Sequence, residues 1–93
     1  MCKINKPIID VAATAANIKA CRIRAGYSVR EIQNIFNFSS PEAIYSWESQ
    51  KYLPSIDNMI VIASVYGVKI DELIVTSTVE VEVETDIREV KSA

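Results

Sequence analysis

The 93-residue sequence contains no histidine and only two cysteines and two glycines. The commonest general base is therefore absent, and a Gly-rich phosphate loop cannot be built. Cys2 and Cys21 are too few for a disulfide framework or a four-ligand zinc site, so Cys21 is expected to be a small core residue. Because nothing in the sequence favours catalysis, we expect no enzyme, no metal and no cofactor.

Long apolar runs are also missing. None approaches the ~18 residues of a membrane span, and the start MCKINKPIID lacks the apolar region of a secretory signal. We expect a cytoplasmic protein with no membrane partner. The length suits one domain. A domain of this size buries only a small core by itself, so it could bury further apolar surface against a partner.

Charge is distributed unevenly along the chain. Residues 1–53 carry seven basic and four acidic groups, a net charge of +3, whereas residues 54–93 carry three basic and eight acidic groups, a net charge of −5. This asymmetry favours a protein that turns one face towards an anion and the other away from it.

Helical patterns occupy residues 10–75. The first helix is predicted from Val11 to Ala25, with Asp10 as N-cap and Gly26 as the stop. One face of this helix is predicted to carry Val11, Thr14, Ala15, Ile18, Cys21 and Ala25. Arg22 falls in the middle of that apolar stripe, and an isolated buried charge is costly, so it needs a carboxylate partner.

The second helix is predicted over residues 29–36. Ser28 forms a capping box with Glu31, and Asn37 suits a left-handed stop. Its predicted inner face consists of Val29, Ile32, Ile35 and Phe36.

The third helix is predicted in the stretch SSPEAIYSWESQ, residues 39–50, with Ser40 as N-cap and Pro41 at the first helical position. Ile44 and Trp47 are predicted to point inward. The residues predicted to point outward are Glu42, Tyr45, Ser46 and Ser49. Glu48 lies on the flank of the inner face and is the predicted partner of Arg22.

Two more helices are predicted before an acidic tail. The fourth runs from Ser55 to Tyr66 and is apolar nearly all round, which indicates a central element or a subunit contact. The fifth lies in KIDELIV, with Ile70, Leu73 and Ile74 inward. Across the five helices the predicted core consists of Ile18, Cys21, Ile32, Phe36, Ile44, Trp47, Ile60, Ala63 and Leu73.

In the tail, residues 76–93, valine and glutamate alternate, which is typical of a strand or of a disordered acidic end. An ordered tail would pair with the same tail of a second copy or with the KINKPII segment. It would then support dimerisation instead of touching DNA, because Glu80, Glu82, Glu84 and Asp86 are repelled by phosphates.

Four features combine into a recognisable pattern between Asn17 and Val75. They are Gly26 before a polar N-cap, Ile-x-x-Trp-Glu at residues 44–48, Pro54-Ser55 before the fourth helix, and GVKIDELI at the end. This arrangement resembles the Xre/Cro-type helix-turn-helix DNA-binding domains, and within them a subset from Gram-positive bacteria and their mobile elements. The sequence departs from the family by Gln33 in place of Ala, by Asn37 in place of Gly, and by a turn one residue longer at Ser39-Ser40.

The resemblance implies an all-α, compact five-helix domain like that of lambda repressor, followed by a short extended or disordered tail. The expected divisions are an N-terminal arm (1–9), the helix-turn-helix domain (10–75) and the acidic tail (76–93). It also implies that residues 39–50 form the recognition helix, and that an Arg22–Glu48 pair supports it. The implied DNA-contacting residues are Arg30, Ser39, Ser40, Glu42, Ala43, Tyr45, Ser46, Gln50, Lys51 and Tyr52.

The sequence and the resemblance leave three classes of function open. The first is a sequence-specific transcriptional regulator, a repressor that binds double-stranded DNA as a homodimer on a pseudo-palindromic operator. The second is a protein-interaction module with the same fold, such as an antitoxin or anti-repressor, which the overall acidity and the apolar fourth helix favour. The third, an enzyme or small-molecule sensor, has little room in this length.

Overall fold

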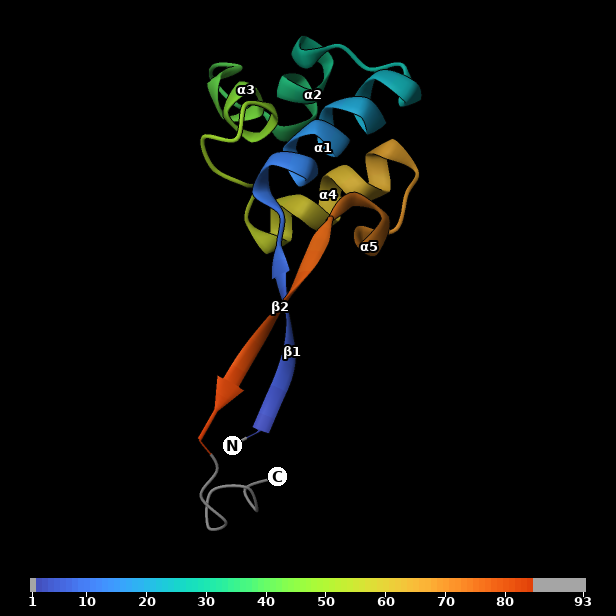
Figure 1. The fold of residues 1–93 in the computed structure, drawn as a ribbon. Helices are drawn as coiled ribbons and strands as arrows, with labels where there is room; N and C mark the ends of the chain where they lie inside the picture. The colour runs from blue at the N-terminus through green and yellow to red at the C-terminus, as the bar shows by residue number, and fades with distance from the viewer. Residues whose placement is uncertain (1, 85–93) are drawn as a thin grey trace.

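The computed structural model describes residues 2–84; residues 1 and 85–93 lie outside this part (Figure 1). The described residues form five helices and two strands, in the order β1 (Cys2–Ile9), α1 (Val11–Ala25), α2 (Val29–Phe36), α3 (Glu42–Glu48), α4 (Ile56–Tyr66), α5 (Ile70–Leu73) and β2 (Thr76–Val83). The helices pack together, and the two strands leave them as one ribbon (Figure 1). No helix within residues 2–84 has the length and apolar character to cross a membrane.

Local signals set the helix ends. The side chain of Asp10 accepts a hydrogen bond of 2.9 Å from the backbone N–H of Ala13, which caps the start of α1. Gly26 ends α1 with φ of +88°, a left-handed conformation that glycine adopts without steric cost. Asn37 ends α2 in the same region, with φ of +57°, as its short polar side chain allows.

Each helix contributes at least one fully buried side chain to a single core. These are Ile18 from α1, Ile32 from α2, Ile44 and Trp47 from α3, Ile62 from α4, and Leu73 from α5. Cys21 and Ala63 are buried with them, and Phe36 packs against the cluster from its edge. The core therefore joins all five helices.

The prediction that Ile60 belongs to the core was wrong. Its side chain is 57% exposed, whereas Met59, Ile62, Ala63 and Tyr66 form the buried face of α4. By helical spacing Ile60 lies about 110° from the centre of that face. Since α4 is apolar nearly all round, its composition could not reveal which side faces inward. Within the described residues, α4 has one buried face and one exposed apolar side.

Three other residues that were predicted to face inward, Val11, Ala25 and Ile35, are exposed. Val11 and Ala25 are the first and last residues of α1, and Ile35 lies on the flank of the inner stripe of α2. Helical periodicity predicts the direction of a side chain, but it does not show where the neighbouring helices stop.

An all-α fold was an incomplete prediction, because the strands β1 and β2 form a two-stranded antiparallel sheet. Their register runs from Cys2 opposite Val83 to Ile9 opposite Thr76. Lys3 Nζ lies 3.8 Å from Glu80 Oε1. The tail up to Val83 is thus a strand, and its partner is the KINKPII segment, one of the two that were considered. The remainder of the predicted tail, with Asp86, lies outside the described residues.

Polar contacts, most of them part-buried, hold the base of the ribbon against α1. The backbone N–H of Val75 donates to Thr14 Oγ1 at 2.9 Å, and the same hydroxyl donates to the Val75 carbonyl at 3.2 Å. The N–H of Asp10 also donates to that carbonyl, at 2.8 Å. Asn17 Nδ2 donates to the carbonyls of Glu72 and Leu73 at the end of α5. The direction in which the ribbon leaves the helices is set by these contacts.

We expect Thr14→Val to lower the free energy of unfolding by about 1–3 kcal/mol, because it leaves the part-buried Val75 N–H without its hydrogen-bond acceptor on the buried Thr14 side chain. Thr14→Ser keeps the hydroxyl and is the matched control. Urea unfolding measures both variants. A loss in Thr14→Val that is much smaller than the loss in Thr14→Ser would show that the methyl group, and not the hydrogen bond, is the main contribution of this side chain.

Candidate nucleic-acid interface

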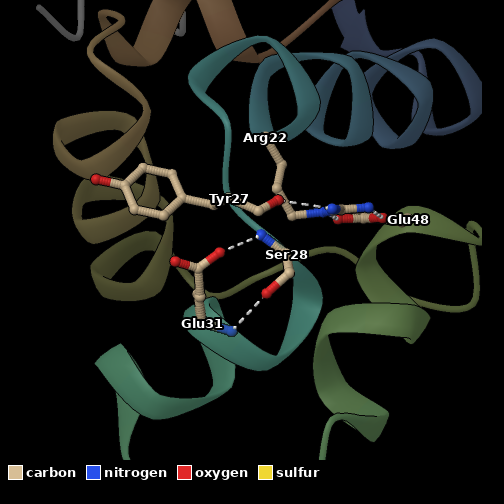
Figure 2. Close-up of polar contacts among 5 residues, drawn as sticks. All are labelled: Arg22, Tyr27, Ser28, Glu31 and Glu48. Carbon is tan, nitrogen blue, oxygen red and sulfur yellow. Dashed lines mark hydrogen bonds and ion pairs between the residues drawn. The ribbon is translucent and has the colours of Figure 1, made fainter.

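A buried ion pair joins α1 to α3. Arg22 Nε and Nη2 donate to the two carboxylate oxygens of Glu48 at 2.7 and 2.9 Å (Figure 2). Only 10% of the Arg22 side chain and 6% of the Glu48 side chain are exposed. The hydrogen bond to Glu48 raises the pKa of Arg22, so the guanidinium stays charged. The pair that periodicity predicted is therefore present, with the two-pronged geometry that arginine and carboxylate favour.

Arg22 also links the pair to the loop before α2. Its Nη1 donates to the backbone carbonyl of Tyr27 at 2.9 Å, and the Tyr27 ring points away from the ion pair (Figure 2). One residue later the predicted capping box is formed: the Ser28 N–H donates to Glu31 Oε1, and the Glu31 N–H donates to Ser28 Oγ. The bond from the Ser28 backbone lowers the pKa of Glu31. The start of α2 and the end of α3 are thus positioned by adjoining polar contacts.

The turn between α2 and α3, residues 37–41, is braced by aromatic rings. Phe38 stacks on Phe36 with ring centroids 5.0 Å apart, and both rings meet Trp47 edge-on, at 6.0 and 5.4 Å. Gln33 Nε2 donates to the Phe38 carbonyl at 3.2 Å. Sequence analysis missed Phe38, although a lone aromatic residue among the polar residues of a turn is a usable signal. This bracing holds the longer turn in place.

The start of α3 differs from the prediction. The helix begins at Glu42, and its N-cap is Pro41 instead of Ser40. Ser40 Oγ still accepts a long hydrogen bond, 3.5 Å, from the Glu42 N–H. The first helical hydrogen bond runs from the Tyr45 N–H to the Pro41 carbonyl at 3.1 Å, and the Pro41 ψ of 3° lies outside the helical range, so the helix begins one residue later than predicted. Ser39 and Ser40 lie exposed just before the helix.

The outer face of α3 presents Glu42, Tyr45 and Ser49 to solvent. Ser46 was predicted to lie there too, but only 4% of it is exposed. The main chain of Ser46 is engaged as well, since its carbonyl accepts a hydrogen bond of 3.1 Å from the Lys51 N–H. Ser46 is therefore not available to a base edge.

The remaining predicted contact residues are mostly at the surface. Arg30 is exposed in the first turn of α2, and Gln50, Lys51 and Tyr52 are exposed just after α3. Gln50 has a left-handed φ of +69°, which turns the chain there. Ala43 is half-buried and packs against the core. The structure thus leaves the predicted residues exposed on α2, on α3 and in the segments beside α3, apart from the buried Ser46 and the half-buried Ala43.

The charge near this surface is smaller than the sequence indicated. Lys3 and Lys6 lie on β1, beside the strand that carries the glutamates. Residues 10–53 without them hold five basic and four acidic groups, a net charge of +1. Sequence position alone could not show that two of the lysines lie on the strand that pairs with the acidic strand. Any anion that meets α3 therefore meets a few separate cations instead of a broad basic patch.

Comparison with known families finds a match. The sequence pattern described as helix-turn-helix matches residues 18–73, more than half of the chain, from within α1 to the end of α5. The ribbon formed by β1 and β2 lies outside the match. A search of curated proteins finds no relative that matches.

Proposed function

The chain belongs to the helix-turn-helix family of the Xre/Cro type, and from this premise we propose that it is a transcriptional regulator that binds a specific sequence in double-stranded DNA. The family is one of DNA-binding domains and not of enzymes. The observation that carries the proposal is the exposed face of α3, which the Arg22–Glu48 pair and the aromatic turn hold in one position.

The dimensions and side chains of α3 suit the major groove of DNA. An α-helix is about 10–12 Å across with its side chains, which matches the width of the groove. The Glu42 carboxylate is suited to accept a hydrogen bond from the N4 amine of a cytosine. Tyr45 and Ser49 lie on the same exposed face, and Ser39 and Ser40 precede it. We assign direct contacts with bases to this group.

Phosphate contacts are assigned to the residues on either side of α3. Arg30 lies on α2, and Lys51 follows α3 together with Gln50 and Tyr52. Such contacts set the position of a protein on the duplex without selecting a sequence. With so few cations, each phosphate contact should account for a large share of the affinity.

A homodimer would place two copies of α3 in successive major grooves. The two half-sites of a pseudo-palindromic operator would then lie about 34 Å apart, one helical turn. Occupying an operator in this way blocks access to it, and we therefore propose a repressor that acts in the cytoplasm.

A second function, a protein-interaction module such as an antitoxin or anti-repressor, is favoured by one observation. Ile56, Ile60 and Val61 form an exposed apolar surface on α4. Binding to duplex DNA that weakens steeply with salt separates the two functions, because release of counterions from phosphates is specific to the first.

Selection of binding sites from random duplexes tests the proposal. A regulator should enrich one sequence with two-fold symmetry and lose affinity as salt increases. If no sequence is enriched and salt has no effect on binding, the proposal is wrong.

The same selection identifies the residues that contact bases. Tyr45→Ala should change the enriched sequence while the free energy of unfolding stays within about 0.5 kcal/mol, because the side chain is exposed. Ser46→Ala, one residue away but buried, should leave the enriched sequence unchanged. The opposite pattern would mean that α3 meets DNA through a different face.

A further inference from the structure

The ribbon has one apolar and one polar face. Directly opposed residues in an antiparallel pair project to the same side, and successive residues alternate. The register therefore puts six apolar side chains on one side, the apolar ribbon face: Cys2, Ile4, Ile8, Val79, Val81 and Val83. The other side, the polar ribbon face, carries Lys3, Asn5, Glu80 and Glu82, with Pro7, Ile9, Thr76 and Thr78 nearer the helices. The contact between Lys3 and Glu80 agrees with this division.

Nothing in the described part of the chain covers the apolar ribbon face. Ile4, Ile8 and Val79 are 50%, 42% and 41% exposed. The ribbon extends away from the helices, and neither strand packs extensively on any of them (Figure 1). Isolated two-stranded ribbons are marginally stable in water and need further strands or a packing partner on their apolar side.

We propose that the apolar ribbon face packs against the same face of a second copy of the chain. A two-fold axis would bring two identical faces together, forming a sandwich of four strands with its layers about 10 Å apart. Such packing covers the isoleucines and valines of both copies and leaves the glutamates in solvent. This interface rests on the homodimer of the proposed function, and it assigns assembly to the ribbon instead of to the helices.

Packing through the faces is favoured over pairing through the strand edges. Pro7 has no N–H to donate along the free edge of β1. At the free edge of β2, antiparallel pairing with a second β2 brings Glu80 and Glu82 of the two copies close together, and like charges in such positions destabilise a sheet. Packing of one apolar ribbon face on the other needs no free N–H group and brings no glutamates together.

Lys6 is the one charged residue on the apolar ribbon face, opposite Val79. Its apolar stem can lie over the valine while the ammonium reaches solvent at the rim. Each strand is about 26 Å long at 3.3 Å per residue, so two ribbons bury on the order of 1,000 Å² in total, the lower end for specific interfaces. The dimer should accordingly dissociate at micromolar concentrations and form more readily when two half-sites hold two copies together.

Sedimentation equilibrium without DNA tests the interface with adjacent substitutions that add the same charge. Ile4→Lys puts the charge on the apolar ribbon face and should weaken dimerisation by roughly 10- to 100-fold at least, because the dimer loses two isoleucines, one from each copy, that are each 50% exposed in the single chain. Asn5→Lys puts it on the polar ribbon face, opposite Glu80, and should leave the dimer intact. Equal effects of the two variants, or a full-length protein that remains monomeric at millimolar concentration, would overturn the proposal.

A substitution that strengthens the dimer cannot act by unfolding the chain, and the proposal predicts one such substitution. Lys6→Leu removes the charge from the apolar ribbon face and should tighten the dimer several-fold, whereas Lys3→Leu, on the polar ribbon face, should not. No tightening in Lys6→Leu would count against the proposal. Ile60→Lys tests the competing surface: if this variant is monomeric and Ile4→Lys is dimeric, α4 forms the interface and the proposal is wrong.

Binding to a duplex with a single half-site keeps this proposal distinct from the proposed function. Ile4→Lys should bind one half-site as the unaltered protein does, since α3 is far from the ribbon (Figure 1). Dimerisation through the ribbon with no binding to any duplex would contradict the DNA function alone. Binding to half-sites with dimerisation unaffected by Ile4→Lys would contradict the ribbon interface alone.

Discussion

Replacing Arg22 with alanine is expected to lower the free energy of unfolding by about 3–5 kcal/mol. Glu48 would keep its charge in a site where only 6% of its side chain is exposed, without the two hydrogen bonds that compensate for burial. The Tyr27 carbonyl would lose a donor as well. Since domains of this size are typically stable by about 5–15 kcal/mol, the variant should be only marginally folded.

The double variant Arg22→Met/Glu48→Leu separates the cost of an unpaired charge from the value of the pair. Apolar side chains of similar volume remove both buried charges, so the double variant should be much more stable than Arg22→Ala. Urea unfolding of the double variant and of its two single variants, Arg22→Met and Glu48→Leu, completes the comparison. Losses that simply add would mean that Arg22 and Glu48 contribute independently.

Trp47→Ala should cost about 3–5 kcal/mol, because it removes a large buried ring and leaves a cavity. The ring lies against Phe36 and Phe38, so the brace of the turn would be lost along with the packing of α3. Trp47→Phe refills part of the space and should lose less. Thermal unfolding measures both, and Tyr45→Ala is the exposed control in the same helix. A loss in Tyr45→Ala as large as in Trp47→Ala would place the inner face of α3 elsewhere.

The helices and the ion pair could be predicted because their signals are local or periodic. Asp10, Gly26 and Ser28 are capping residues with direct physical roles, and they mark the limits of α1 and α2 as the structure has them. The charge of Arg22 in an apolar stripe implied a carboxylate, and spacing on α3 pointed to Glu48. Both inferences depend only on geometry within a single helix.

The errors arose where packing between elements decides the outcome. Ser46 is buried although helical spacing puts it opposite Ile44, and Ile60 is exposed because nothing in the described residues covers that side of α4. Neither event has a signal within the helix concerned. The alternation in β2 indicated a strand, but its partner β1 lies at the opposite end of the chain, so the choice between two partners needed the structure.

The most direct test of DNA recognition by α3 is an NMR titration of the isotope-labelled protein with the duplex enriched by selection. At 0.15 M salt, the backbone amide chemical shifts should change most in residues 37–52 and in the first turn of α2. The size of these changes should increase in proportion to the fraction of protein that is bound to duplex. The exposed side of α4 and the polar ribbon face should change little. Shifts concentrated on α4 or on the ribbon, with residues 37–52 unchanged, would contradict the assignment of α3 as the recognition helix.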